Sequence, residues 1–190
     1  TELLNCKLSI DLAQGIRIED EFLGLKSSIQ PVAIECDPIV INNSEFESTE
    51  SPEEIARLIL NKMRAAWWAT GRGNYENVWN DVQRGDSVCK SLYYFKMDNI
   101  LGNDRIENSR FLAHLENDKL AIIDASLADY MQTSPGLGNK YFIATDAIED
   151  DKVYSIIVSS ASDGFNSLIL AEIEPKSLED YNPEFLGNGQ

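Results

Sequence analysis

A cysteine, a histidine and an aspartate are the residues of this chain whose types and order could carry out catalysis. Cys89 follows Gly85-Asp86-Ser87, a run typical of a helix start. In the first turn of a helix, unpaired backbone N–H groups and the positive helix end stabilise a thiolate. His114, the one histidine in the chain, would act as the base, and Asp124 would orient it.

A helix-borne cysteine followed by a strand-borne histidine is the layout of papain-like and transglutaminase-like enzymes. This resemblance implies a cysteine-dependent hydrolase or acyltransferase, which is the alternative function. No signature of those families surrounds Cys89, and a tight turn at Asn117-Asp118 would not place Asp124 opposite His114. A small apolar filler at the base of a helix is the competing interpretation of Cys89. We therefore expect a binding protein rather than an enzyme.

Acidic side chains dominate the chain, which has a formal net charge of −16. They gather in a polar loop before Ser51 and in a turn that we expect between two late strands. The carboxylates predicted to bind a partner are Glu45, Glu47, Glu50, Glu53, Asp146, Glu149, Asp150 and Asp151. Their field would speed association with a basic partner, and it would repel nucleic acid and anionic membranes.

The middle of the chain differs from the rest, because residues 57–96 hold seven basic and three acidic side chains and all three tryptophans. Trp68 lies one residue, about 100°, away from the apolar stripe of its predicted helix. Trp68 and Arg72 are therefore candidate binding residues, since Trp and Arg are enriched at binding hot spots. The alternative is that Trp68 packs beneath neighbouring strands.

These features favour a non-enzymatic, acidic, intracellular protein that binds another macromolecule. Inhibitors, immunity-type proteins, nucleic-acid mimics and assembly components act in this way. We expect a protein partner with a basic surface, no direct nucleic-acid binding, no membrane association and no cofactor. The oligomeric state is left open.

The cysteines and the acidic run 146–151 bear on metal binding and on the compartment. We expect no metal site, because there is no Cys-x-x-Cys pair and the run lacks the Asp-x-Asp-x-Asp-Gly order of a calcium loop. Three sparse cysteines suit a reducing, cytoplasmic setting better than a disulfide scaffold. No apolar run approaches the roughly 18 residues of a membrane-spanning helix.

The elements that position these residues are predicted as strands, then helices, then strands. Apolar and polar residues alternate over residues 3–12, which predicts a half-buried strand. Ser51-Pro52-Glu53-Glu54 begins the first of three helices, at about 51–70, 74–84 and 87–101. A mainly antiparallel sheet of about five strands follows, and His114 lies in its first strand, over residues 110–116. Grouped helices followed by grouped strands indicate an α+β fold.

We predict a single domain over residues 1–175, followed by a loosely packed acidic tail over residues 176–190. The apolar periodicity predicts which side chains form the core. They are Leu4, Leu8, Ile10, Ile55, Leu58, Ile59, Phe95, Ile122 and Ile156.

Overall fold

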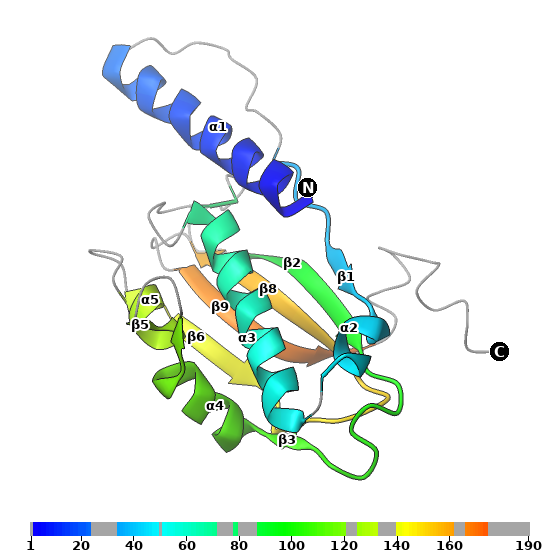
Figure 1. Ribbon diagram of the computed structural model, residues 1–190. Coiled ribbons are helices and arrows are strands. Elements are labelled where there is room, and N and C mark those ends of the chain that lie inside the picture. The colour runs from blue at the N-terminus through cyan, green and yellow to red at the C-terminus, as the bar shows by residue number, and fades with distance from the viewer. Residues whose placement is uncertain are drawn as a thin grey trace, which may run out of the picture.

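A five-stranded mixed sheet with helices packed against one face forms the centre of the molecule (Figure 1), so the α+β prediction is confirmed. The structure is a computed structural model that describes residues 2–23, 34–49, 51–71, 78–79, 87–120, 125–132, 140–161 and 166–174. Its helices are α1 (Glu2–Leu23), α2 (Asn43–Glu47), α3 (Pro52–Ala69), α4 (Asn108–Asn117) and α5 (Leu127–Gln132). Its strands are β1 (Ile39–Ile41), β2 (Ser87–Lys96), β3 (Ile106–Glu107), β4 (Lys119–Leu120), β5 (Ala125–Ser126), β6 (Lys140–Ala144), β7 (Ala147–Ile148), β8 (Val153–Ala161) and β9 (Asn166–Ile173).

The order of strands in the main sheet is β1-β2-β8-β9-β6. The three long central strands β2, β8 and β9 pair antiparallel, whereas β1 and β6 join the two edges in parallel, so the sheet is mixed and not mainly antiparallel as predicted. Two short ladders, β3 with β7 and β4 with β5, lie outside this sheet. Because β2, β9 and β6 run in the same direction, their carboxyl ends meet at one end of the sheet.

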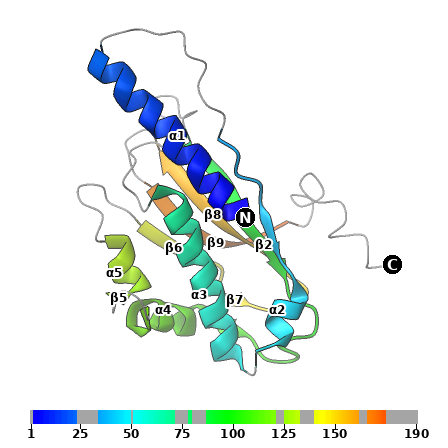
Figure 2. The same ribbon diagram turned by 45° about the horizontal axis from the view of Figure 1, so that its top comes forward.

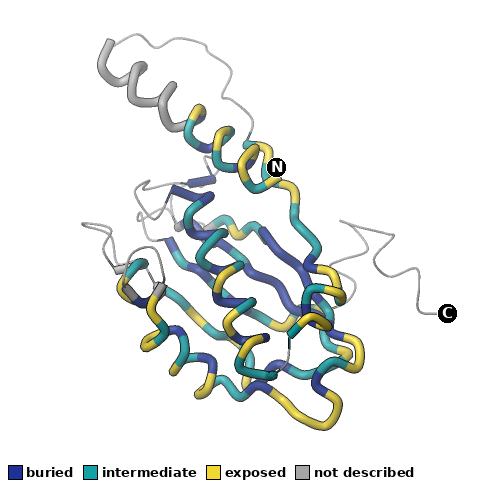
Figure 3. Tube along the Cα trace, in the orientation of Figure 1, coloured by how far each residue is buried: buried dark blue, intermediate teal, exposed yellow. Residues whose placement is uncertain are grey.

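The helix α3 forms where the sequence predicts it. The Ser51 Oγ accepts a hydrogen bond from the N–H of Glu54 (3.3 Å), and Pro52 occupies the first helical position. Its apolar stripe, which includes the fully buried Ile59, packs onto the central strands (Figure 3). The predicted core residues Ile10, Ile55, Ile59, Phe95 and Ile156 are all buried, and Leu58 packs against them partly buried.

The predicted N-terminal strand is wrong, because residues 2–23 form the helix α1. The apolar residues of this segment are spaced by two, so every second one of them is spaced by four. In a helix, this spacing places them in two sets on opposite faces. Cys6 and Ile10 point inward and are buried. Leu4 and Leu8, predicted as core, point outward and are 49% and 50% exposed.

The predicted helix over residues 87–101 is also wrong, because residues 87–96 form the central strand β2. A β-bulge between Ser91 and Tyr93 shifts the alternation by one residue. Leu92, Tyr93 and Phe95 therefore all join the main core, at spacings that resemble a helical stripe. Most of the predicted helix 74–84, Ile122 and the predicted tail 176–190 lie outside the described residues.

A disulfide bond joins Cys6 of α1 to Cys36, and Cys89 is the free cysteine. The bond argues against the reducing setting expected from sparse cysteines, because disulfides persist in oxidising compartments. None of the helices in the described part of the chain is long and apolar enough to cross a bilayer.

Candidate functional site

The free thiol of Cys89 lies in the strand β2 and not at the start of a helix. It is exposed, and its Sγ is 3.2 Å from the Oγ of Ser159, its partner residue in β8. The helix end that was expected to stabilise a thiolate is therefore missing. What remains is an accessible thiol beside a hydroxyl group.

His114 lies in the helix α4 and not in the predicted strand over residues 110–116. Its Nδ1 is 3.0 Å from the Oδ2 of Asp118, which also accepts a hydrogen bond from the Nε of Arg57 (2.7 Å). Burial raises the pKa of Asp118, but the hydrogen bonds from Arg57 and His114 outweigh it, so the pKa lies below its ordinary value. Cys89 and His114 thus have different partners, and Asp124 lies outside the described residues.

The acidic stretches meet at the end of the sheet where β2 finishes. The helix α2, which carries Glu45 and Glu47, contacts the loop after β2 through Asn43: the N–H of Asp98 donates to the Asn43 Oδ1 (3.0 Å). The turn before β8 contacts the same loop, because the N–H of Asp151 donates to the carbonyl of Met97 (2.9 Å). Figure 1 shows α2, this loop and the turn side by side.

Asp150 is the residue that holds this loop in place. Its carboxylate accepts hydrogen bonds from three consecutive backbone N–H groups, those of Ile100 (3.1 Å), Leu101 (2.9 Å) and Gly102 (2.8 Å). Satisfying three loop donors is a structural role, so Asp150 is less available to a partner than a free carboxylate. We call the whole surface the acidic end and define it as Glu45, Glu47, Asp98, Asp104, Asp146, Glu149, Asp150 and Asp151.

Four cations partly neutralise the acidic end. The Nζ of Lys62 lies 2.6 Å from Glu45, and Lys96 pairs with Asp98 and with Asp151. Lys152 and Arg105 both pair with Glu149. Within the described part of the chain, the exposed side chains of Asp104 and Asp146 have no partner. Glu53 lies at the start of α3, where it pairs with Arg110 (3.0 Å), and Glu50 lies outside the described residues.

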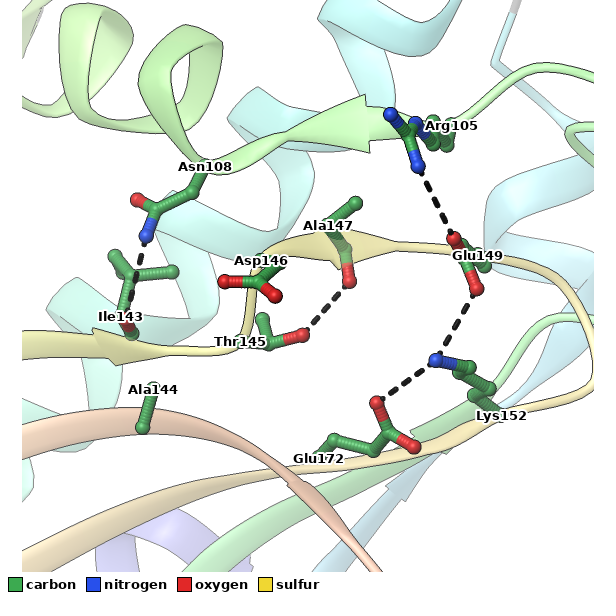
Figure 4. Close-up of a pocket in the computed structure, with 10 residues that line it drawn as sticks. All are labelled: Arg105, Asn108, Ile143, Ala144, Thr145, Asp146, Ala147, Glu149, Lys152 and Glu172. Carbon is green, nitrogen blue, oxygen red and sulfur yellow. Dashed lines mark hydrogen bonds and ion pairs between the residues drawn. The ribbon is translucent and has the colours of Figure 1, made fainter.

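A polar cleft of about 540 Å³ opens at the acidic end (Figure 4). Lys152 lies between Glu149 and Glu172, 3.1 Å from each, and the guanidinium of Arg105 lies 3.8 Å from Glu149. Asp146 lines the same cleft. The basic and acidic side chains of the cleft alternate, so they could contact polar groups of a partner. Among the described residues, no three His, Cys, Asp or Glu side chains are arranged to hold a metal ion.

Trp68 is half-buried and faces α1. The Nζ of Lys7 lies 5.3 Å from the centroid of a Trp68 ring, within the range of a cation–π contact. The neighbouring Trp67 is fully buried in the core. Trp68 therefore has an intramolecular partner, and Arg72 lies outside the described residues.

The sequence did not single out Arg105 and Lys152, because each is an isolated basic residue with no local motif around it. Only the folded sheet brings them to one cleft. The chain matches no protein-family model, no curated protein and no solved structure.

Proposed function

We propose that this chain binds a protein partner with a basic surface through the acidic end. The observation that carries the proposal is the meeting of two acidic stretches that are far apart in the sequence. The loop between them is held by hydrogen bonds to Asn43 and Asp150, so the carboxylates keep their spacing before a partner arrives. Such a surface needs little rearrangement on binding, which favours affinity.

Electrostatics of this kind acts mainly on the rate of association. Carboxylates that already pair with lysine or arginine contribute little additional attraction, whereas Asp104 and Asp146 are exposed and lack such a neighbour among the described residues. Opposite charges steer encounter at low salt, and added salt screens this effect within a Debye length. The proposal therefore predicts a fast, salt-sensitive association whose rate depends on these positions.

Among the described residues, Cys89 and His114 give no support to the alternative of a cysteine-dependent hydrolase or acyltransferase. Cys89 lies on a strand beside Ser159, and His114 is paired with Asp118. The Cys6–Cys36 bond also favours an oxidising compartment, so we do not propose a reducing one.

Charge reversal with a matched control tests the proposal. The first variant carries Asp104→Lys and Asp146→Lys, and the second carries Glu2→Lys and Glu116→Lys, which change the net charge equally but lie away from the acidic end. The probe is an oligolysine peptide, followed by stopped-flow fluorescence at low salt. We expect the first variant to lower the association rate by about ten-fold and the second to change it far less. Equal losses in both variants would mean that only net charge matters, and the proposal would be abandoned.

A further inference from the structure

One side of the strand β2 is only partly paired with a neighbouring strand. On the β8 side, its pairing runs from Ser87 to Lys96. On the other side, β1 covers only Tyr93, Tyr94 and Phe95. No strand in the described ranges pairs with residues 87–92 on that side. An open edge of this kind presents unpaired backbone N–H and C=O groups, which can pair with another chain.

A groove of about 600 Å³ runs along this open edge. One wall is formed by residues 34–38, and the other by residues 88–91 together with Tyr94. Successive side chains of a strand point to opposite faces of the sheet. The four consecutive residues 88–91 can therefore all line the same groove because the groove runs along the backbone edge of β2. The groove therefore lies between two lengths of backbone.

The far wall is held away from β2 by α1. The disulfide bond ties Cys36 to Cys6, and the N–H of Glu35 donates to the Oγ of Ser9 (3.1 Å). Figure 2 shows this segment beside α1 on its way to β1. Because a covalent bond fixes the segment to α1, it cannot simply extend β1 along the open edge of β2 while that bond is intact.

We propose that this groove binds an extended, basic segment of a partner protein, which adds as a strand beside β2. Glu35 and Asp37 are exposed on the wall of the groove, with the less exposed Cys36 between them. Alternate residues of an extended segment point to the same side, so the two carboxylates match basic side chains two positions apart. Lys90 on the opposite wall lies 5.1 Å from the centroid of a Trp79 ring, which engages its charge.

This site is separate from the acidic end. The groove lies at the Ser87 end of β2, and the acidic end begins beyond Lys96. Cys89 lies seven residues before Lys96, the last residue of β2, which is about 23 Å at a rise of about 3.3 Å per residue. Strand addition at the groove therefore does not rest on the function proposed for the acidic end, and variants can test the two sites separately.

The free thiol of Cys89 provides a readout, because Cys89 belongs to the part of β2 that lines the groove and a strand added there would place a side chain beside it, whereas the other two cysteines are joined to each other. The probe is a short peptide of alternating arginine and valine, added to the oxidised protein without reductant. We expect it to slow the alkylation of Cys89 in proportion to its occupancy, measured by mass spectrometry. A peptide with proline in place of valine has the same charge, but it loses the N–H groups along one edge and its rings fix φ at about −65°, which disfavours an extended strand, so we expect much weaker protection from it.

A second measurement tests the carboxylates. The double variant Glu35→Gln, Asp37→Asn keeps side-chain size and should weaken peptide binding by about 2-fold to 30-fold, as expected for two exposed ion pairs. The matched control Asp104→Asn, Asp146→Asn removes two charges at the acidic end, so it should leave the protection of Cys89 by the peptide nearly unchanged, even where it weakens binding of the peptide at the acidic end. Both variants are compared by the peptide concentration that half-protects Cys89 from alkylation, at the same salt concentration, because this readout reports on the groove.

Three results would overturn the proposal. Equal binding of the proline peptide would show that charge alone attracts it, without strand addition. Unchanged alkylation of Cys89 at saturating arginine–valine peptide would place the peptide elsewhere. Concentration-dependent dimerisation that protects Cys89 in the absence of peptide, measured by analytical ultracentrifugation, would make a second copy of this chain the occupant.

Discussion

Reduction of the Cys6–Cys36 bond is the perturbation whose size follows most directly from the structure. The bond closes a loop with a sequence separation of 30 residues and ties α1 to the segment before β1. In the chain-entropy description, cross-linking restricts the unfolded state, and a loop of this length stabilises the fold by about 3.6 kcal/mol at 25 °C. For a chain of this size, the corresponding fall in melting temperature is about 7 to 14 °C.

Urea denaturation with and without a phosphine reductant measures this difference. Cys89→Ser serves as the background, because it removes the free thiol and prevents exchange with the disulfide. We expect a lower urea midpoint and a larger slope after reduction, since the unfolded chain without the cross-link exposes more surface. A loss of less than about 1 kcal/mol would refute the chain-entropy reasoning for this bond. It would also mean that the contacts of α1 with α3 hold the helix without covalent help.

Three further predictions concern the core, the loop of the acidic end and pH. Ile59→Ala should destabilise the fold by about 2–5 kcal/mol because Ile59 is fully buried, whereas Leu8→Ala, at a half-exposed position, should cost much less. Urea denaturation measures both losses, and equal losses would contradict the assignment of Ile59 to the core and Leu8 to the surface. Asp150→Ala leaves three loop N–H groups without their acceptor, so the amides of residues 100–102 should exchange hydrogen much faster, while unchanged exchange would argue against this role. The pKa of Asp118 is lowered in the fold, so its contribution to stability is present above the ordinary aspartate pKa of about 3.9 and is lost as pH falls through the lower folded value. Asp118→Asn should flatten that part of the pH–stability profile, and an unchanged profile would contradict the assignment.

Local sequence signals predicted the elements that short-range chemistry determines. The helix α3 begins at Ser51 and Pro52 because a capping side chain and a proline favour a helix start whatever surrounds them. The apolar spacing that follows predicted Ile55 and Ile59 in the core, and both are buried. The α+β class was also predicted, although the order of elements behind it was wrong at residues 3–12, 87–96 and 110–116.

Two elements were beyond prediction from local pattern, for different physical reasons. In residues 4–12, spacing by two is also spacing by four, so the same leucines fit a half-buried strand or a helix with two apolar faces. In β2, a bulge beside Ser91 breaks the alternation that would have indicated a strand. Only pairing with β8 and β1, which are distant in sequence, makes residues 87–96 extended.

The sequence by itself determined the composition of the candidate sites. The excess of acid, and the two stretches in which it is concentrated, can be read without a structure. The tertiary structure alone decided that these stretches meet, that Asp150 holds the loop between them, and that Cys36 bonds to Cys6 beside an open strand edge. These facts depend on contacts between residues far apart in the chain, in the sheet and between α1 and the segment before β1.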